Sequence, residues 1–116
     1  MKPEAMNDLL VVWTCTEKET VENMVFLYTL NSKLRNWWGS VTLLIWGASA
    51  RLASEDTPIQ EQLALMSEAG VRVIACKKCA ENLGVAEKLE SLGIEVFYTG
   101  EFLTDWIKSG KTVLTF

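Results

Sequence analysis

Apolar and polar positions divide this chain into short hydrophobic runs separated by longer mixed segments. Runs rich in β-branched residues are typical of buried strands. They occur at residues 8–15, 41–46, 71–76, 94–98 and 112–116. The run at 41–46, Val-Thr-Leu-Leu-Ile-Trp, is the most apolar, and we therefore expect it to lie centrally in a sheet with both of its faces covered.

Helical periodicity marks the two longest segments between these runs. Residues 17–35 place apolar side chains at helical spacing and predict an amphipathic helix. Those side chains are Val21, Met24, Val25 and Tyr28. After a loop predicted at residues 47–53, a second helix is expected to start at Thr57-Pro58-Ile59-Gln60 and to end at Gly70. The threonine of this start is the expected cap, and its glutamine completes a capping box.

Shorter helices are predicted at residues 77–83, 86–92 and 101–108. Strands and helices thus alternate along the chain, which is typical of an α/β domain with a parallel sheet. We expect a single domain over residues 1–116, in which a five-stranded, mainly parallel sheet carries helices on both faces as a three-layer sandwich. Ligands bind beyond the carboxyl ends of such strands. Three segments therefore form the candidate site: Thr14–Lys18, Gly47–Leu52 and Cys76–Cys79.

The charge of the chain argues against several partners. Asp and Glu number 15 and Lys and Arg 11, for a net charge of -4, and the bases form no long run. We therefore expect neither nucleic acid nor an anionic membrane surface as a partner. No apolar stretch reaches the roughly 20 residues of a transmembrane helix, and the first residues lack the features of a signal peptide. The predicted location is the cytoplasm, where the three cysteines stay reduced.

Histidine is absent from the sequence. This excludes a serine–histidine or cysteine–histidine nucleophile pair and a histidine-based metal site within one chain. Three cysteines alone do not complete a structural zinc site. We expect neither a metal nor an organic cofactor.

The segment Cys76-Lys77-Lys78-Cys79 is the strongest candidate for chemistry. Cys76 ends a predicted strand, and the free N–H groups and dipole of the helix that follows favour an anion such as a thiolate. Lys77 and Lys78 add positive charge, and Cys79 lies one turn further on, where it can resolve a bond formed on Cys76. Two packed cysteines without a chemical role fit the same spacing. A thioredoxin-like fold is disfavoured, because the motif follows the third strand and Pro58 begins a helix.

Two further places carry weaker signals. Gly47 and Ser49, small residues after the central strand, are candidate contacts for a small anionic ligand, or else belong to a tight connection. Cys15 ends the first strand at the same edge as Cys76 and either joins the site or packs in the core.

Five tryptophans are many for a chain of 116 residues. Trp13 and Trp46 fall on predicted strands and are expected in the core. Trp37 and Trp38 follow a helix, where an exposed interface and core packing both remain open.

With these residues in view, the chain resembles the DsrE-like sulfur-relay family, of the DsrE, DsrF and TusD type. The resemblance rests on an ordered set of segments: residues 44–52 (LIWGASARL), 69–71, 75–80 (ACKKCA), 83–85, 92–96 and 110–116. It implies a YchN-like fold, homotrimers or hexamers, and exchange of sulfane sulfur with donor and acceptor proteins. It also implies that Cys76, eight residues before Gly84, carries the sulfur as a persulfide. Cys79 departs from the single cysteine that many relatives have in this turn.

Three functions therefore remain open. The first is a sulfur relay through a persulfide on Cys76, which would make the protein a sulfurtransferase if it is an enzyme. The second is a dithiol redox protein that links Cys76 and Cys79 reversibly. The third is a non-enzymatic subunit that binds a small anion or supports an assembly, with Cys76 inert.

Overall fold

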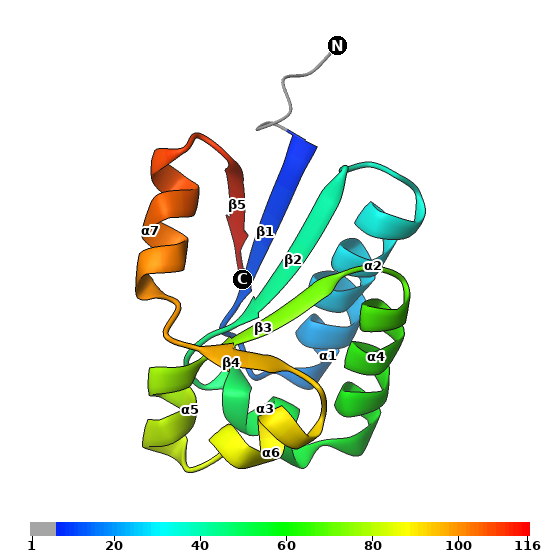
Figure 1. Cartoon of the computed structure of the whole chain (residues 1–116). Coiled ribbons are helices and arrows are strands. Elements are labelled where there is room, and N and C mark those ends of the chain that lie inside the picture. Colours follow the sequence, from blue (N-terminus) through cyan, green and yellow to red (C-terminus); the bar gives the residue numbers. More distant parts are fainter. Residues whose placement is uncertain (1–6) are drawn as a thin grey trace.

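Five parallel strands form the centre of the structure, a computed structural model that describes residues 7–116. The strands are β1 (Asp8–Trp13), β2 (Ser40–Ile45), β3 (Arg72–Cys76), β4 (Glu95–Phe97) and β5 (Thr112–Thr115). Their order in the sheet is β4-β3-β2-β1-β5, and each neighbouring pair is parallel (Figure 1). The predicted parallel α/β sheet is confirmed. The prediction that no signal peptide is present rests on residues outside the described part.

Helices cover the two faces of the sheet unequally. The short α1 (Lys18–Thr20) has no buried residue. The six segments that follow it pack with the larger core cluster: the π-helical η2 (Val21–Val25), α2 (Phe26–Leu34), α3 (Ser49–Glu55), α4 (Thr57–Glu68), α5 (Lys77–Leu83) and α6 (Ala86–Ser91). Within residues 7–116, α7 (Gly100–Lys108) is the one helix that packs on the opposite face. Figure 1 shows α7 on one side of the sheet and α2 and α4 on the other.

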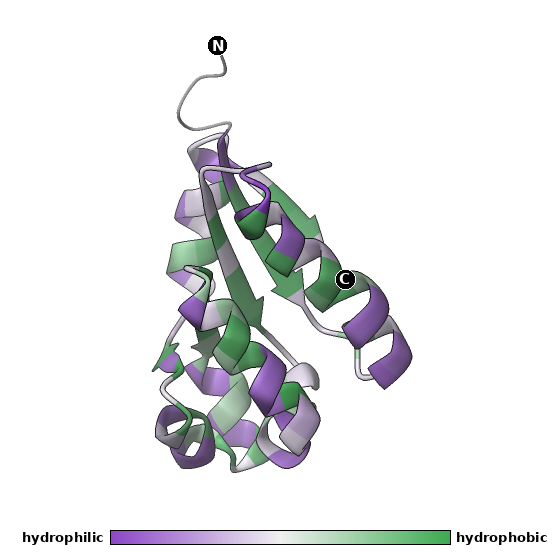
Figure 2. Ribbon diagram, turned by 90° about the vertical axis from the view of Figure 1, so that its right-hand side faces the viewer, coloured by the Kyte–Doolittle hydropathy of each residue, from purple (hydrophilic) through white to green (hydrophobic). Residues whose placement is uncertain are grey.

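Alternation along β1 supplies both cores, because successive side chains of a strand point to opposite faces. Leu9, Val11 and Trp13 belong to the larger cluster. Leu10 and Val12 belong to the smaller one, under Phe102 and Trp106 of α7. The apolar residues of Figure 2 accordingly gather on the strands and on the inward sides of the helices.

Two local predictions are wrong. Residues 47–53, expected to be a loop, mostly form α3, which begins at Ser49 directly after the turn at Gly47. The cap of α4 is Asp56 and not Thr57, because the Asp56 carboxylate accepts a hydrogen bond from the Ile59 amide at 3.0 Å. Gln60 completes no capping box, since its side chain donates to the Ala53 carbonyl at 3.0 Å.

The long first helix also differs from its prediction. Val21 and Val25 are buried as expected, but Met24 is half exposed. The π-helical turn of η2 and two small buried polar residues, Thr29 and Ser32, shift the inward face of this helix away from Met24. Thr29 satisfies its hydroxyl by donating to the Val25 carbonyl at 2.6 Å, which lets a polar residue occupy a core position.

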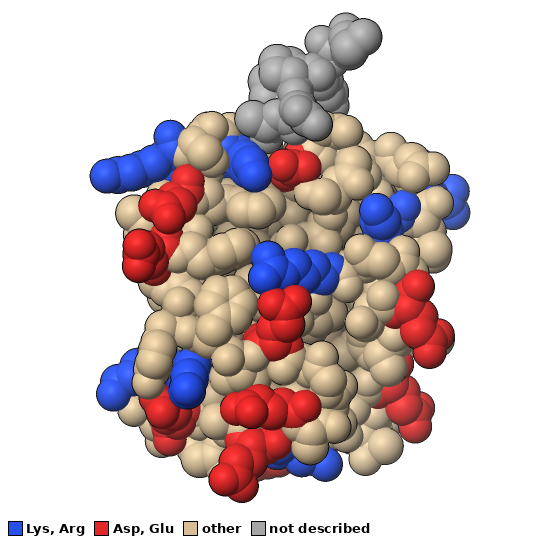
Figure 3. Space-filling model, in the orientation of Figure 1, with Lys and Arg blue, Asp and Glu red and all other residues tan. Residues whose placement is uncertain are grey.

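Charged side chains are scattered over the surface. On the face in Figure 3, Lys and Arg side chains form no large continuous patch, and acidic side chains neighbour several of them. Arg72 and Glu95 form a partly exposed ion pair, with 2.8 Å between the guanidinium and the carboxylate. No helix within residues 7–116 is both long and apolar enough to cross a membrane.

Candidate functional site

The carboxyl ends of three neighbouring strands bring the site together. Ile45 of β2 lies opposite Ala75 of β3, and Cys76 at the end of β3 lies opposite Phe97 of β4. The segments that follow these strands therefore meet at one edge of the sheet. They carry Gly47, the Cys76–Cys79 turn, and Thr99.

Cys76 is the buried member of a thiol pair, with 6% of its surface exposed. Burial is the largest single influence on its pKa and acts to raise it. Hydrogen bonding from the Thr99 side chain, the Cys79 amide, the Cys79 thiol and the Thr99 amide acts in the opposite direction. The combined effect of these donors prevails, and the pKa of Cys76 is lowered, which favours its thiolate.

Cys79 is the half-buried member and behaves in the opposite way. Burial raises its pKa most strongly, and the neighbouring Cys76 raises it further through a hydrogen bond and through charge. The Gly47 amide and the Trp46 side chain oppose this rise without cancelling it. The two thiols are therefore unequal: Cys76 loses its proton more readily than Cys79, which keeps the proton when the pair carries one negative charge.

Thr99 is the contact that sequence reasoning did not identify. It is buried and stands at the N-cap position of α7, yet its hydroxyl makes no hydrogen bond to the first turn of that helix. The hydroxyl instead interacts with Cys76. Its position at the end of a fourth strand, on the edge already chosen for the site, is the signal that was available in the sequence.

Replacing Thr99 by valine is expected to slow alkylation of Cys76 at neutral pH by about tenfold, because a hydrogen bond to a charged group contributes about 1.5–3 kcal/mol. Loss of that donor raises the pKa of Cys76 and leaves less thiolate. The measurement is the rate of iodoacetamide capture at Cys76 as a function of pH. Thr99→Ser, which keeps the hydroxyl, is the matched control. A profile for Thr99→Val that superposes on the wild-type profile would contradict this role.

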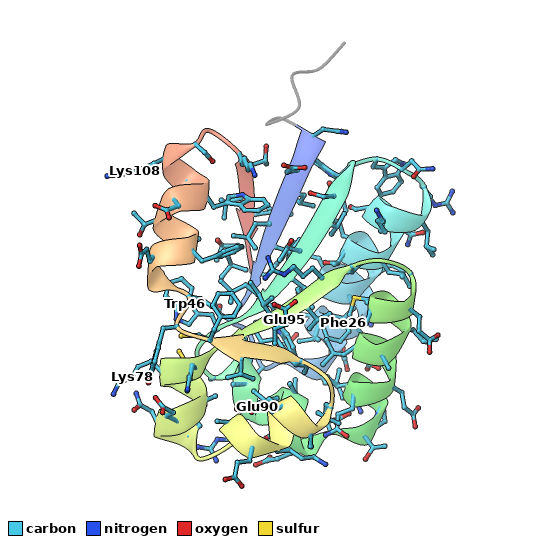
Figure 4. All side chains as sticks on the ribbon, viewed as in Figure 1. Phe26, Trp46, Lys78, Glu90, Glu95 and Lys108 are labelled. Carbon is cyan, nitrogen blue, oxygen red and sulfur yellow. The ribbon has the colours of Figure 1, made fainter. Side chains whose placement is uncertain are left out.

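The lysines of the motif lie at the edge of the site. The Lys77 ammonium sits 5.3 Å from the centre of the Tyr98 ring, and Lys78 is exposed and points away from the body of the protein (Figure 4). Among the groups of residues 7–116 that lower the pKa of Cys76, neither lysine appears. Hydrogen bonding, and not lysine charge, is what favours the thiolate.

Gly47 and Ser49, both candidate binding residues, have different places. Gly47 lies beside Cys79 and, with it, lines an open pocket of about 260 Å³. Ser49 is fully buried, and its hydroxyl lies 2.6 Å from the Trp13 carbonyl and 3.0 Å from the Trp46 carbonyl. The Ser49 side chain therefore ties α3 to the ends of β1 and β2.

Cys15 and the tryptophans singled out in the sequence have different positions relative to the thiol pair. Cys15 is half-buried and packs on the larger core cluster, which agrees with the packing alternative. Trp13 is fully buried, as predicted, whereas Trp46 is half-buried and contacts Cys79. Trp37 is 51% exposed, and Trp38 is half-buried with its indole N–H 3.2 Å from the Tyr28 hydroxyl.

Known proteins and a protein-family model resemble this chain. The model of the DsrE/DsrF-like family matches residues 27–116. Among solved structures, the conserved protein of unknown function BT1422 from Bacteroides thetaiotaomicron is 41% identical, with a TM-score of 0.92 over 95% of each chain. No curated protein gives a match to this chain.

Two more distant structures share the fold. The ychN protein from E. coli is 20% identical, with a TM-score of 0.68 over 96% of this chain and 99% of its own. MTH1491 from Methanobacterium thermoautotrophicum, a protein of unknown function, is 19% identical, with a TM-score of 0.64 over 95% of this chain and 98% of its own. The expected YchN-like fold is therefore confirmed. Since the family model matches residues 27–116, well over half of the chain, this protein belongs to the DsrE/DsrF-like family.

Proposed function

We propose that this protein is a sulfur carrier that holds sulfane sulfur as a persulfide on Cys76. The observation that supports this most directly is a thiol whose pKa is lowered despite burial, by hydrogen-bond donors from Thr99 and from its own turn. A thiolate is the species that attacks a sulfane donor. Family membership supports the same function, since the DsrE-like family is associated with sulfur relay.

In the transfer, the Cys76 thiolate forms a bond to the outer sulfur of a persulfide donor, and the donor's S–S bond breaks. The donor leaves as a thiol after taking up the proton of the transferred group. The hydrogen-bond donors around Cys76 then stabilise the persulfide anion as they stabilise the thiolate. An acceptor thiolate reverses the sequence, so no cofactor is needed.

Partners and location follow from this function. A carrier needs a protein that donates sulfur and one that accepts it, and we propose that both are met in the cytoplasm. By analogy with the family resemblance, we propose a homotrimer or a hexamer as the assembled form. The protein is a sulfurtransferase if it transfers sulfur repeatedly from the donor protein to the acceptor protein.

A dithiol redox function is the second candidate, because the Cys76 and Cys79 side chains are in direct hydrogen-bonding contact. A disulfide between them would form by attack of one thiolate on an oxidised partner thiol. The two functions predict different products on the same two residues.

Loading of the reduced protein with a sulfane donor tests the proposal. Excess donor is removed, the thiols and persulfides are capped with iodoacetamide, and the protein is cut with trypsin. Cleavage after Arg72, Lys77 and Lys78 separates residues 73–77, which carry Cys76, from residues 79–88, which carry Cys79. One additional sulfur atom on residues 73–77 is expected. A disulfide joining the two peptides would favour the redox function, and unmodified peptides would exclude both.

A further inference from the structure

The two thiols of the pair differ in how a partner molecule reaches them. Cys76 is 6% exposed. Cys79 lines the open pocket of about 260 Å³ together with Gly47, Ala48, Asn82 and Leu83, and this lining does not include Cys76. A donor that carries its sulfur on a peptide or a protein therefore meets Cys79 first. Direct attack by Cys76 on such a donor would require the pair to rearrange.

Cys79 has hydrogen-bond donors of its own. The Gly47 amide and the Trp46 indole N–H both act to lower its pKa. Gly47 has a φ of 69°, in the left-handed region that favours glycine, and this turn at the end of β2 lies beside Cys79. These donors stabilise negative charge on the Cys79 sulfur, which matters when Cys79 is a nucleophile or a leaving group. The Gly47 amide and the Trp46 indole N–H would not be required if the only role of Cys79 were to donate a proton to Cys76.

We propose that Cys79 is the thiol through which sulfane sulfur enters and leaves the protein, and that Cys76 is the thiol on which it is stored. This inference rests on the proposed function and assigns different roles to the two cysteines. The substrate class is a persulfide carried on a thiol too large to reach Cys76, such as a peptide or protein persulfide. The pocket at Gly47 and Cys79 is its docking position.

In the entry step the proton shared by the pair moves from Cys79 to Cys76. The Cys79 thiolate then attacks the outer sulfur of the donor persulfide, R–S–SH. A new S–S bond forms on Cys79, the S–S bond of the donor breaks, and R–S⁻ leaves. R–S⁻ takes up the proton from Cys76, which regenerates the Cys76 thiolate.

In the internal step the Cys76 thiolate attacks the outer sulfur of the Cys79 persulfide. The bond between that sulfur and Cys79 breaks, and Cys79 leaves as a thiolate stabilised by the Gly47 amide and the Trp46 indole. Proton transfer from the new persulfide to Cys79 restores one proton and one negative charge on the pair. The sulfane sulfur keeps its oxidation state throughout, so neither step needs an oxidant or a reductant.

The test follows sulfur over time from glutathione persulfide, a tripeptide donor, with the iodoacetamide quench and the two tryptic peptides described above. In the wild-type protein, sulfur is expected first on residues 79–88 and then on residues 73–77. Cys79→Ser keeps a hydroxyl donor beside Cys76 but removes the entry thiol. It is expected to slow the appearance of sulfur on residues 73–77 by at least about tenfold, while iodoacetamide capture of Cys76 changes by no more than about twofold. Trp46→Phe is expected to prolong the adduct on residues 79–88.

Cys15→Ser, which removes the half-buried thiol outside the pair, is the matched control and is expected to load like the wild type. Loading of Cys79→Ser at the wild-type rate would overturn the entry role and leave the carrier function intact. An equal fall in loading and in iodoacetamide capture would overturn it as well, because Cys79 would then only tune Cys76. A wild-type protein that takes up no sulfur would overturn the carrier function itself.

Discussion

Replacing Cys76 by serine is expected to reduce the sulfur that the protein retains to the background level. The variant can still accept sulfur on Cys79, but that sulfur stays in an open pocket, where free thiols remove it. Serine offers no thiolate to draw the sulfur into the buried position. The measurement is the intact mass after loading, removal of the donor and a short incubation with excess glutathione.

The contrast with Cys15 makes this result specific. Cys15→Ser removes a half-buried thiol that packs against the larger core cluster, and it is expected to retain as much sulfur as the wild-type protein. Retention by Cys76→Ser that equals the wild-type amount would show that storage does not depend on Cys76. Unfolding curves of both variants check that the comparison is between folded proteins.

Replacing Trp13 by alanine is expected to cost about 3–5 kcal/mol of unfolding free energy, the usual range when a buried large aromatic residue is truncated. Trp13 is fully buried, its ring meets Phe26 edge-on at 4.9 Å, and its indole N–H donates to the Cys15 carbonyl at 2.8 Å. Since domains have stabilities of about 5–15 kcal/mol, this loss takes a large share of the total. Denaturant-induced unfolding followed by circular dichroism measures it.

Trp37→Ala is the matched control for that experiment. Trp37 is 51% exposed and contacts Tyr28 at a ring distance of 5.9 Å. Its removal is expected to cost well under half as much as the removal of Trp13, because little buried surface is lost. Equal losses in the two variants would contradict the assignment of Trp13 to the core and of Trp37 to the surface.

The fold could be predicted because its strands are nearly continuous apolar runs. β2, for example, is buried along almost its whole length, and only a central parallel strand requires that composition. The segment 47–53 could not be assigned correctly, because a helix as short as α3 has weak periodicity. It is held in part by a tertiary hydrogen bond from the Ser49 hydroxyl to the Trp13 carbonyl at the end of β1, which no local pattern reports.

Of the candidate site, only the residues that lie close together in the sequence could be predicted. Cys76 and Cys79 are separated by one helical turn, so their contact follows from spacing. Thr99 and Trp46 follow the ends of β4 and β2 and contact the pair from there, so their contribution depends on where three strands end relative to one another. Charge alone predicts an effect of Lys77 and Lys78 on Cys76, but the direction in which a lysine side chain points does not follow from the sequence.

The contact between Cys76 and Cys79 also bears on oxidative damage. A low-pKa thiolate is readily oxidised by peroxide to a sulfenic acid, and further oxidation to the sulfinic and sulfonic acids is irreversible in most proteins. Because the Cys79 thiol lies in contact with Cys76, a sulfenic acid on Cys76 would condense with it, release water and form a disulfide that cellular thiols can reduce. The neighbour that raises the reactivity of Cys76 thus also limits its oxidation to a recoverable form.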